Sequence, residues 1–151
     1  MSRKRVVFNH MKNFLFNILL LSGFFIFPTH ASEKSKAADD AELYIISPLD
    51  GDTVSSPVKI VFGLKGMGIA PAGIKYDNTG HHHLLIDAAE IPNSNFPIPS
   101  DDNHKHFGKG QTETTIALQP GEHTLQLILG DHMHIPHDPV VVSKKVKINV
   151  E

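Results

Sequence analysis

Residues 118–131 read LQPGEHTLQLILGD, and this stretch indicates the fold class more clearly than any other. Pro120 and Gly121 together are typical of a tight turn. After this turn, Leu125, Leu127 and Leu129 recur at every second position, which is the period of a strand with one buried face. The sequence therefore predicts a turn followed by a strand whose leucine side chains face a core.

Short runs with the same period occur on both sides of this stretch and are separated by Gly, Pro and Asp residues. We expect further strands at residues 43–47, 58–64, 81–87, 112–118 and 140–150. Loops are expected at residues 66–80, 88–110 and 130–139, and the long loop 88–110 has room for a short edge strand. No stretch after residue 31 has a helical period. These features predict an all-β fold, an antiparallel β-sandwich of about six to seven strands.

Two stretches also resemble a known type of domain. Residues 46–64, ISPLDGDTVSSPVKIVFGL, are similar to the first two strands of many bacterial immunoglobulin-like modules. Residues 118–131 are similar to the E–F turn and F strand of the same modules. This resemblance implies an immunoglobulin-like β-sandwich, with its loops gathered at the two ends.

The N-terminal segment has the layout of a secretory signal peptide. A basic start is followed by an apolar run over residues 14–27 and by Thr29-His30-Ala31, which suits cleavage after Ala31. The run is shorter than the roughly 20 residues that span a bilayer, so we expect no stable membrane anchor after cleavage. Translation could start at Met1 or at Met11. We therefore expect a signal peptide at residues 1–31, a flexible leader at 32–42, a single β-sandwich domain at 43–151, and a location in the periplasm or outside the cell.

The composition restricts the chemistry that is open to the domain. The 151 residues include 11 His and no Cys, which excludes disulfides, thiolate metal sites and iron–sulfur clusters. Loss of residues 1–31 would remove four of the 14 Lys and Arg and none of the 16 Asp and Glu, leaving a net charge of −6. Such an acidic chain is unsuited to nucleic acid, whose phosphates attract Lys and Arg. Nine histidines would remain, because His10 and His30 belong to the signal peptide.

Most of these histidines are expected at one end of the sandwich. Successive antiparallel strands alternate in direction, so the starts of the strands at 81–87 and 112–118 and the end of the strand at 125–129 meet at the same end. The candidate metal ligands there are His81, His83, His104, His106, His132, His134 and His137. His82 shares a face with Leu84 and Ile86 and is interpreted as structural. His123 lies beside the turn at the opposite end, and we expect it to hold that turn.

Neutral imidazoles without thiolates suit Cu(II), Zn(II) or Ni(II), and copper or zinc is the expected ion. Met67 and Met133, also expected near this end, could add a thioether ligand and so allow Cu(I). Asp87, Asp131 and Asp138 could ligate the ion or fix the tautomer of a ligating ring.

Several segments resemble a small exported bacterial domain that is catalogued as domain of unknown function 4399. They are GLKGMGIAPAG at 63–73, GHHHLLID at 80–87, HFGKGQTET at 106–114, LQPGEHTLQLILGD at 118–131 and HIPHDPVVVS at 134–143. The resemblance covers about residues 43–151. The family has no established activity, so the resemblance implies no ligand. Its characteristic elements fall on residues 80–83, 106–110 and 130–139, the segments that the strand directions bring together.

Two functions remain open at this point. The first is an exported protein that binds a transition metal through the His cluster. The alternative is a non-catalytic interaction module that binds an envelope protein, with His-rich loops that are structural or respond to pH. Protonation of all nine remaining histidines would move the net charge from −6 to +3. We do not expect an enzyme, because the chain has no G-x-S-x-G, no H-E-x-x-H and no phosphate-binding loop. The oligomeric state stays open.

Overall fold

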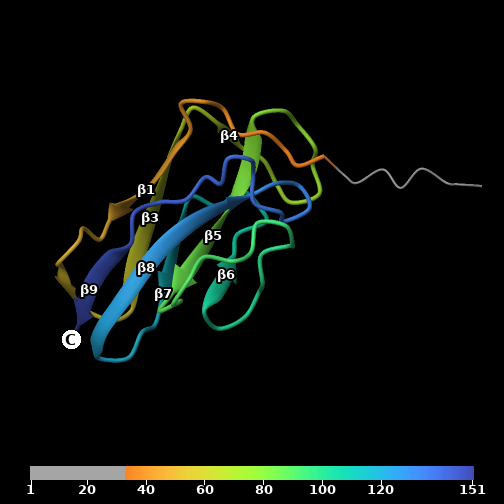
Figure 1. Ribbon diagram of the computed structural model, residues 1–151. Helices are drawn as coiled ribbons and strands as arrows, with labels where there is room; N and C mark the ends of the chain where they lie inside the picture. The colour runs from red at the N-terminus through yellow and green to blue at the C-terminus, as the bar shows by residue number, and fades with distance from the viewer. Residues whose placement is uncertain (1–32) are drawn as a thin grey trace, which may run out of the picture. The chain divides into compact units, whose positions relative to one another are not determined.

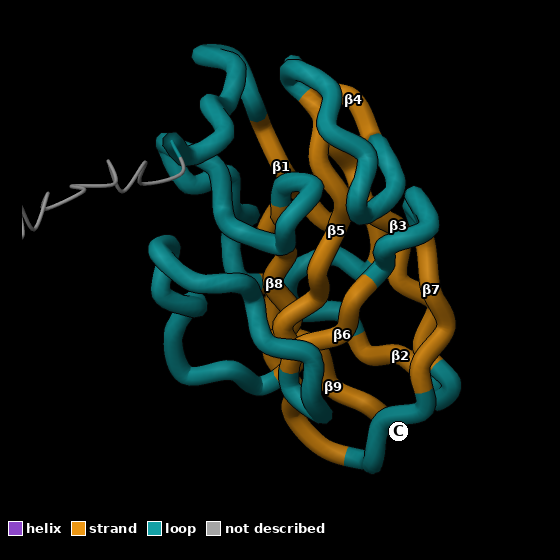
Figure 2. The backbone as a smooth tube through the Cα atoms, turned by 90° about the vertical axis from the view of Figure 1, so that its right-hand side faces the viewer, coloured by secondary structure: helices purple, strands orange, loops and turns teal. Residues whose placement is uncertain are grey.

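The computed structural model describes residues 33–151 (Figure 1), so the expected signal peptide, with His10 and His30, lies outside the described residues. Residues 33–151 form strands, turns and loops and no helix (Figure 2). Accordingly, this part of the chain has no helix that is long and apolar enough to cross a membrane. The predicted all-β fold is confirmed.

The strands of residues 33–151 form two sheets that pack face to face. The small sheet has the order β1-β3-β7, and the large sheet has the order β2-β9-β8-β5-β4 with β6 paired to β5. The strands are β1 Glu42–Ser47, β2 Thr53–Val54, β3 Val58–Lys65, β4 Gly68–Ile69, β5 Thr79–Ile86, β6 His104–His106, β7 Glu113–Ile116, β8 Gly121–Gly130 and β9 Val146–Val150. The longer pairs are antiparallel, whereas the two-residue strands β2 and β4 pair in parallel with β9 and β5.

The sequence-based strand limits differ from the structure mainly at the C-terminal strand. Residues 140–145 were expected to continue the strand that ends at residue 150, but regular pairing begins only at Val146. Residues 141–143 still pair with β8, through Leu129 N to Val141 O (3.0 Å) and Ser143 N to Leu127 O (2.9 Å), but only as an isolated bridge, and the Leu127 N–H is bound by the Ser143 hydroxyl (2.9 Å). The short edge strand that was expected within 88–110 is present as β6.

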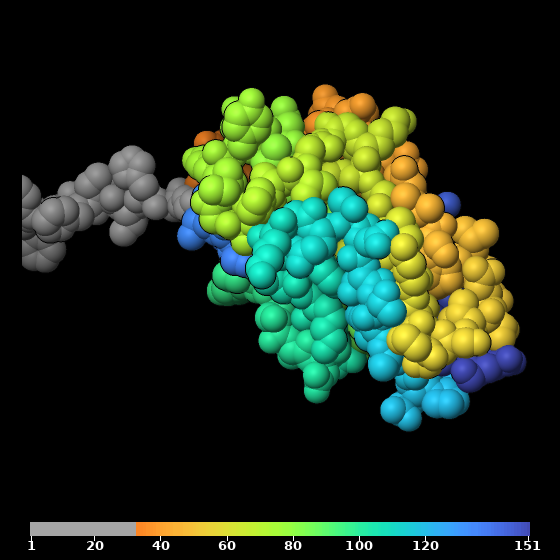
Figure 3. All heavy atoms as spheres, turned by 180° about the vertical axis from the view of Figure 1, so that it is seen from behind, coloured from red at the N-terminus to blue at the C-terminus, as the bar shows by residue number. Residues whose placement is uncertain are grey.

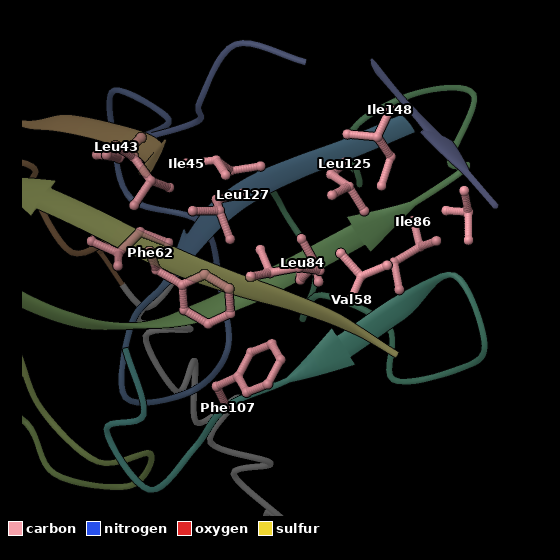
Figure 4. Packing of buried hydrophobic residues seen from close by; sticks show 14 residues of the cluster. Leu43, Ile45, Val58, Phe62, Leu84, Ile86, Phe107, Leu125, Leu127 and Ile148 are labelled. Atoms are coloured by element: carbon pink, nitrogen blue, oxygen red, sulfur yellow. The ribbon is translucent and has the colours of Figure 1, made fainter. Parts of the chain in front are cut away.

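The main core lies between the two sheets, as Figure 4 shows. The alternating residues of the predicted strands supply it: Leu43 and Ile45 from β1, Val58, Ile60 and Phe62 from β3, Leu84 and Ile86 from β5, Leu125, Leu127 and Leu129 from β8, and Ile148 and Val150 from β9. Burial of each such side chain contributes about 1.5–3 kcal/mol of favourable transfer free energy. This burial on alternate positions fixes which face of each strand is turned to the core.

The outer face of the large sheet is covered as well. Leu85, Ile98 and Ile128 form a second buried cluster, against which Val140 and Val142 pack. Consequently β5 is buried on both faces, and the seven consecutive residues from Gly80 to Ile86 are all buried. His82 shares the core face of β5 with Leu84, while the two histidines on either side of it point to the outer face, beneath the loops.

Candidate metal centre

Four histidine rings from three segments lie together on the outer face of the large sheet. His81 and His83 come from β5, His106 is the last residue of β6, and His134 lies in the loop after β8. All six distances between ring centroids fall between 4.7 and 5.9 Å. We call this group the four-histidine cluster. The sequence-based expectation that these segments converge is met by these four residues.

The two β5 rings are the most deeply buried part of the cluster. Alternate residues of a strand share a face, and here the rings of His81 and His83 tilt together until their Nε2 atoms are 3.0 Å apart. Both residues are completely inaccessible to solvent. Their Nδ1 atoms are buried without a hydrogen-bond partner. The nitrogens that face each other are the Nε2 atoms, so an ion held between them would leave both Nδ1 atoms without a partner.

Strand register brings His106 to the cluster. In the antiparallel pairing of β5 with β6, His106 lies opposite His83. Gly108 leaves room for the ring, because a Cβ atom at that position would overlap the His106 imidazole. His106 is exposed, and Figure 3 shows the segment around residues 100–112, in green to teal, at the surface of the molecule. The cluster is therefore closed on the β5 side and reachable from solvent on the His106 side.

A strained turn presents His134. Its backbone has φ +67°, a left-handed conformation that costs a non-glycine residue about 1 kcal/mol or more and persists only when the surroundings impose it. Asp131 imposes it here, since its Oδ1 accepts the N–H groups of Met133 (2.8 Å) and Ile135 (3.0 Å) and its backbone oxygen accepts that of His134 (2.9 Å). The ring is thereby turned toward the other three.

Burial keeps three of the four rings neutral. Desolvation, reinforced by the neighbouring His134 and His106, lowers the pKa of His81 from 6.5 to about 4. Desolvation and the adjacent rings lower the pKa of His83 to about 2. The pKa of His106 is lowered too, by desolvation and by His134. These three imidazoles are thus uncharged at neutral pH and have lone pairs available, which is the form that binds a metal ion.

The nitrogen positions suit a single ion. One nitrogen from each of His81, His83 and His106 lies within 4.8 Å of the others. Two nitrogens bound to one ion at about 2.0–2.1 Å lie about 2.9–3.4 Å apart, and the 3.0 Å between the β5 nitrogens falls in this range. His134 is adjacent, with its ring centroid 4.7 Å from that of His106, but it does not belong to the set of three whose nitrogens lie within 4.8 Å of one another.

The other three candidate ligands lie outside the cluster. The register that brings His106 to His83 places His104 opposite Leu85, and its Nδ1 pairs with Asp101 (2.8 Å). His137 is buried against backbone oxygens, with Nε2 3.1 Å from Thr79 O and Nδ1 3.4 Å from Leu129 O. His132 is partly exposed, and its Nδ1 is 3.8 Å from Asp131.

The two histidines that were interpreted as structural behave so. His82 is 1% exposed, packs against Phe62 with ring centroids 5.0 Å apart, and its Nδ1 lies 3.1 Å from Gln111 O. Its Nε2 is buried without a partner and burial lowers its pKa, but its ring lies on the core face, away from the four-histidine cluster. His123 holds the turn at the other end, with Nδ1 2.7 Å from Asp87 Oδ2 and Nε2 2.8 Å from Gln119 O. The Asp87 hydrogen bond raises the pKa of His123 above its usual value.

The other suggested donors have different surroundings. Met67 packs against the main core, and Met133 is 52% exposed. Asp87 binds His123 and the Thr124 N–H at the opposite end of the domain. Asp138 pairs through its backbone with residues 35–37. Of the three suggested aspartates, Asp131 is therefore the one that shapes the loop of the cluster.

Sequence reasoning overlooked two glycines that the cluster requires. Besides Gly108, Gly130 faces His81 across the β5–β8 pair, and a Cβ atom there would lie 3.0 Å from His83 Nε2. The absence of a side chain leaves the β5 rings space to converge. The signal was present in the sequence, because each glycine lies within four residues of a cluster histidine.

A protein-family model matches more than half of the chain. No curated protein matches the chain. The family model described as "Domain of unknown function (DUF4399)" matches residues 60–151, a range that includes the whole four-histidine cluster. The chain therefore belongs to the DUF4399 family, as the resemblance of its sequence segments implies.

Proposed function

We propose that the domain binds one transition-metal ion through the four-histidine cluster. The observation that carries this proposal is the convergence of four imidazoles, with two buried Nε2 atoms 3.0 Å apart. A bound cation would replace the direct contact between the two Nε2 atoms, which lie close enough to share one ion. Uncharged rings also remove the repulsion that protonated histidines would exert on the ion.

Copper or zinc is the ion that we propose. A nitrogen-only donor set suits both Cu(II) and Zn(II), and Cu(II) binds such a set more tightly in the usual order of divalent ions. Tetrahedral coordination by four nitrogens would accommodate Zn(II), and rings crowded within 4.7–5.9 Å of one another are compatible with that number of ligands.

We further propose that the chain is exported and acts in the periplasm or outside the cell after cleavage behind Ala31. The basic start, apolar run and small residues before the cleavage point support this. The chain should be expressed with its own residues 1–31 and without a polyhistidine tag. N-terminal sequencing of the protein released by osmotic shock is then expected to begin at Ser32. Recovery of unprocessed protein in the cytoplasm would contradict export.

Metal binding is tested on the same processed protein. After removal of metal with a chelator, Cu(II) and Zn(II) are titrated in competition with a chromophoric chelator. We expect one equivalent to bind with a dissociation constant below the micromolar range, and Cu(II) spectra to show nitrogen ligands. Absence of stoichiometric binding would overturn the proposal.

The neighbouring histidines of β6 provide a matched control. The variant His106→Ala removes a cluster ring near the surface, whereas His104→Ala removes a ring two residues away that faces Leu85 and Asp101. We expect His106→Ala to lower metal affinity strongly and His104→Ala to leave it unchanged. Equal affinities in the two variants would place the ion elsewhere.

A further inference from the structure

Residues 34–37 lie against the loop that carries His134. The backbone of Ser35 accepts a hydrogen bond from Asp138 N (2.9 Å), and Ala37 N donates to Asp138 O (3.1 Å). The Ser35 hydroxyl donates to Asp131 Oδ2 at 2.7 Å. The segment that the sequence predicts to be a flexible leader thus makes specific hydrogen bonds with both ends of the loop 131–138.

Ser35 forms its side-chain hydrogen bond with Asp131, the residue that holds the turn at His134. Asp131 is 5% exposed and uses its two carboxylate oxygens for different purposes. Oδ1 accepts the two backbone N–H groups of the turn, and Oδ2 accepts the Ser35 hydroxyl. Because the two oxygens belong to one rigid group, the hydroxyl restricts rotation of the carboxylate. A fixed carboxylate in turn keeps His134 in its left-handed conformation.

A second connection reaches His134 from the other side. Lys34 Nζ donates to Ser94 Oγ (3.0 Å), and Ser94 belongs to the loop that follows β5. Further along the same loop, Ile98 N donates to the backbone oxygen of His134 (2.8 Å). The N-terminal segment therefore contacts both of the loops that hold the fourth ring.

Beyond these contacts the segment borders open space. A cavity of about 480 Å³ is lined by residues 33–36 and 74–79 together with Asp131, His132 and His137. Ala37 packs against the main core, whereas residues 34–36 border the cavity and are held chiefly by their hydrogen bonds. Loss of one such hydrogen bond should therefore disturb the conformation of the loop 131–138.

We propose that residues 34–37 position His134 as the fourth ligand of the metal centre, with Ser35 acting through Asp131. This inference rests on the proposed metal-binding function. The three remaining rings belong to β5 and β6, which the strand ladders hold independently of the segment. The segment therefore sets how completely the ion is coordinated, while the ladders set whether a site exists at all.

The test is a double-mutant cycle on the processed full chain with Cu(II) as the probe. We expect Ser35→Ala to lower Cu(II) affinity about 3- to 10-fold, at or below the lower limit of the roughly 10- to 100-fold that outer partners of metal ligands contribute. Ser35→Thr retains the hydroxyl and should restore affinity. In a His134→Ala background, Ser35→Ala should not change Cu(II) affinity further. The electron paramagnetic resonance spectrum of the Cu(II)-loaded double variant should match that of His134→Ala alone.

The control and the contrary outcomes are distinct. Ser56 also makes a side-chain hydrogen bond to a distant backbone group, Leu118 N at 3.1 Å, so Ser56→Ala is a matched loss of a hydroxyl. It should leave Cu(II) affinity unchanged. If wild-type protein binds no Cu(II), the proposed function fails. If wild-type protein binds and Ser35→Ala binds equally well, or if Ser35→Ala weakens binding to the same extent with and without His134, the positioning role alone is overturned.

Discussion

His83 and His123 occupy opposite ends of one domain and show opposite chemistry. His123 has a partner at each ring nitrogen, Asp87 at 2.7 Å and the Gln119 carbonyl at 2.8 Å, and its pKa is raised. His83 is fully buried among other imidazoles, one of its nitrogens has no partner, and its pKa is lowered to about 2.

The difference shows how surroundings separate these two histidines. His82 shares with His83 an unpartnered buried nitrogen and a lowered pKa, so its position on the core face, away from the other rings, is what excludes it as a ligand. The Asp87 carboxylate raises the pKa of His123 and binds one ring nitrogen, and the Gln119 carbonyl binds the other, so neither nitrogen is left for a ligand. Neutral rings that face one another keep lone pairs available and gain most from a shared cation. Burial by itself does not distinguish a structural histidine from a candidate ligand, since His137 is 1% exposed and yet has a backbone oxygen near each nitrogen.

The largest expected effect is a change in metal affinity when His83 and His123 are each replaced by alanine in separate variants. His83→Ala should reduce Cu(II) or Zn(II) affinity by more than the roughly 100-fold upper range for loss of an outer partner, because it removes a ligand. His123→Ala should leave affinity unchanged and lower the free energy of unfolding. Metal titration and urea unfolding measure the two quantities. Loss of metal binding in His123→Ala would contradict the assignment of His123 as a structural residue.

The next effect tests whether ring placement matters as much as ring presence. Gly108→Ala keeps all four rings but forces His106 to move, because a Cβ atom would overlap its ring. We expect metal affinity to fall about 10-fold, as it does when the orientation of a ligand is disturbed. At Gly68 the nearest atom to an added Cβ is 3.4 Å away, so Gly68→Ala is the control and should bind metal like wild type. Equal affinities would show that His106 is dispensable.

A smaller effect is expected in the pH dependence of the metal-free protein. The folded-state pKa of His81, about 4, lies below the unfolded value of 6.5, so the unfolded chain takes up protons first as the pH falls. Stability should therefore decrease from pH 6.5 downward. His123 acts oppositely: its contribution is complete below 6.5 and is lost as the pH rises through its raised pKa.

Urea unfolding in the presence of a chelator, repeated at pH values below and above 6.5, separates the contribution of His81 to stability from that of His123. His123→Gln should abolish the change above pH 6.5 and leave the change below it. If acidification to about pH 5 left the stability of the metal-free protein unaltered, the cluster rings would not be neutral in the folded state.

The smallest effect is expected for His132→Ala. This residue was a candidate ligand, but its ring is partly exposed and 3.8 Å from Asp131. Removal of the ring should change the free energy of unfolding by no more than about 0.5 kcal/mol, as for most surface positions. Metal affinity should also remain that of wild type. A marked loss of affinity would add His132 to the cluster.

Much of this arrangement follows from periodicity alone. The period of two placed His81 and His83 on one face and His82 with Leu84 on the other, and alternation of strand directions brought the three His-bearing segments together. The sequence could not choose between His104 and His106, because the choice depends on strand register across a long loop. Nor could spacing separate His134 from His132 and His137, since a left-handed turn set by Asp131 decides which ring points to the cluster.

The register of β5 against β6 and β8 has one more consequence. The cluster histidines are distant along the chain and meet only when these strands pair, so an unfolded chain has no assembled site. An ion that binds the folded form alone would stabilise it by mass action, by about 2.7 kcal/mol when free metal is 100 times the dissociation constant. On the proposed export route, a chain that crosses the membrane unfolded would meet its metal where it folds, and the metal supply of that compartment would then determine which ion it carries.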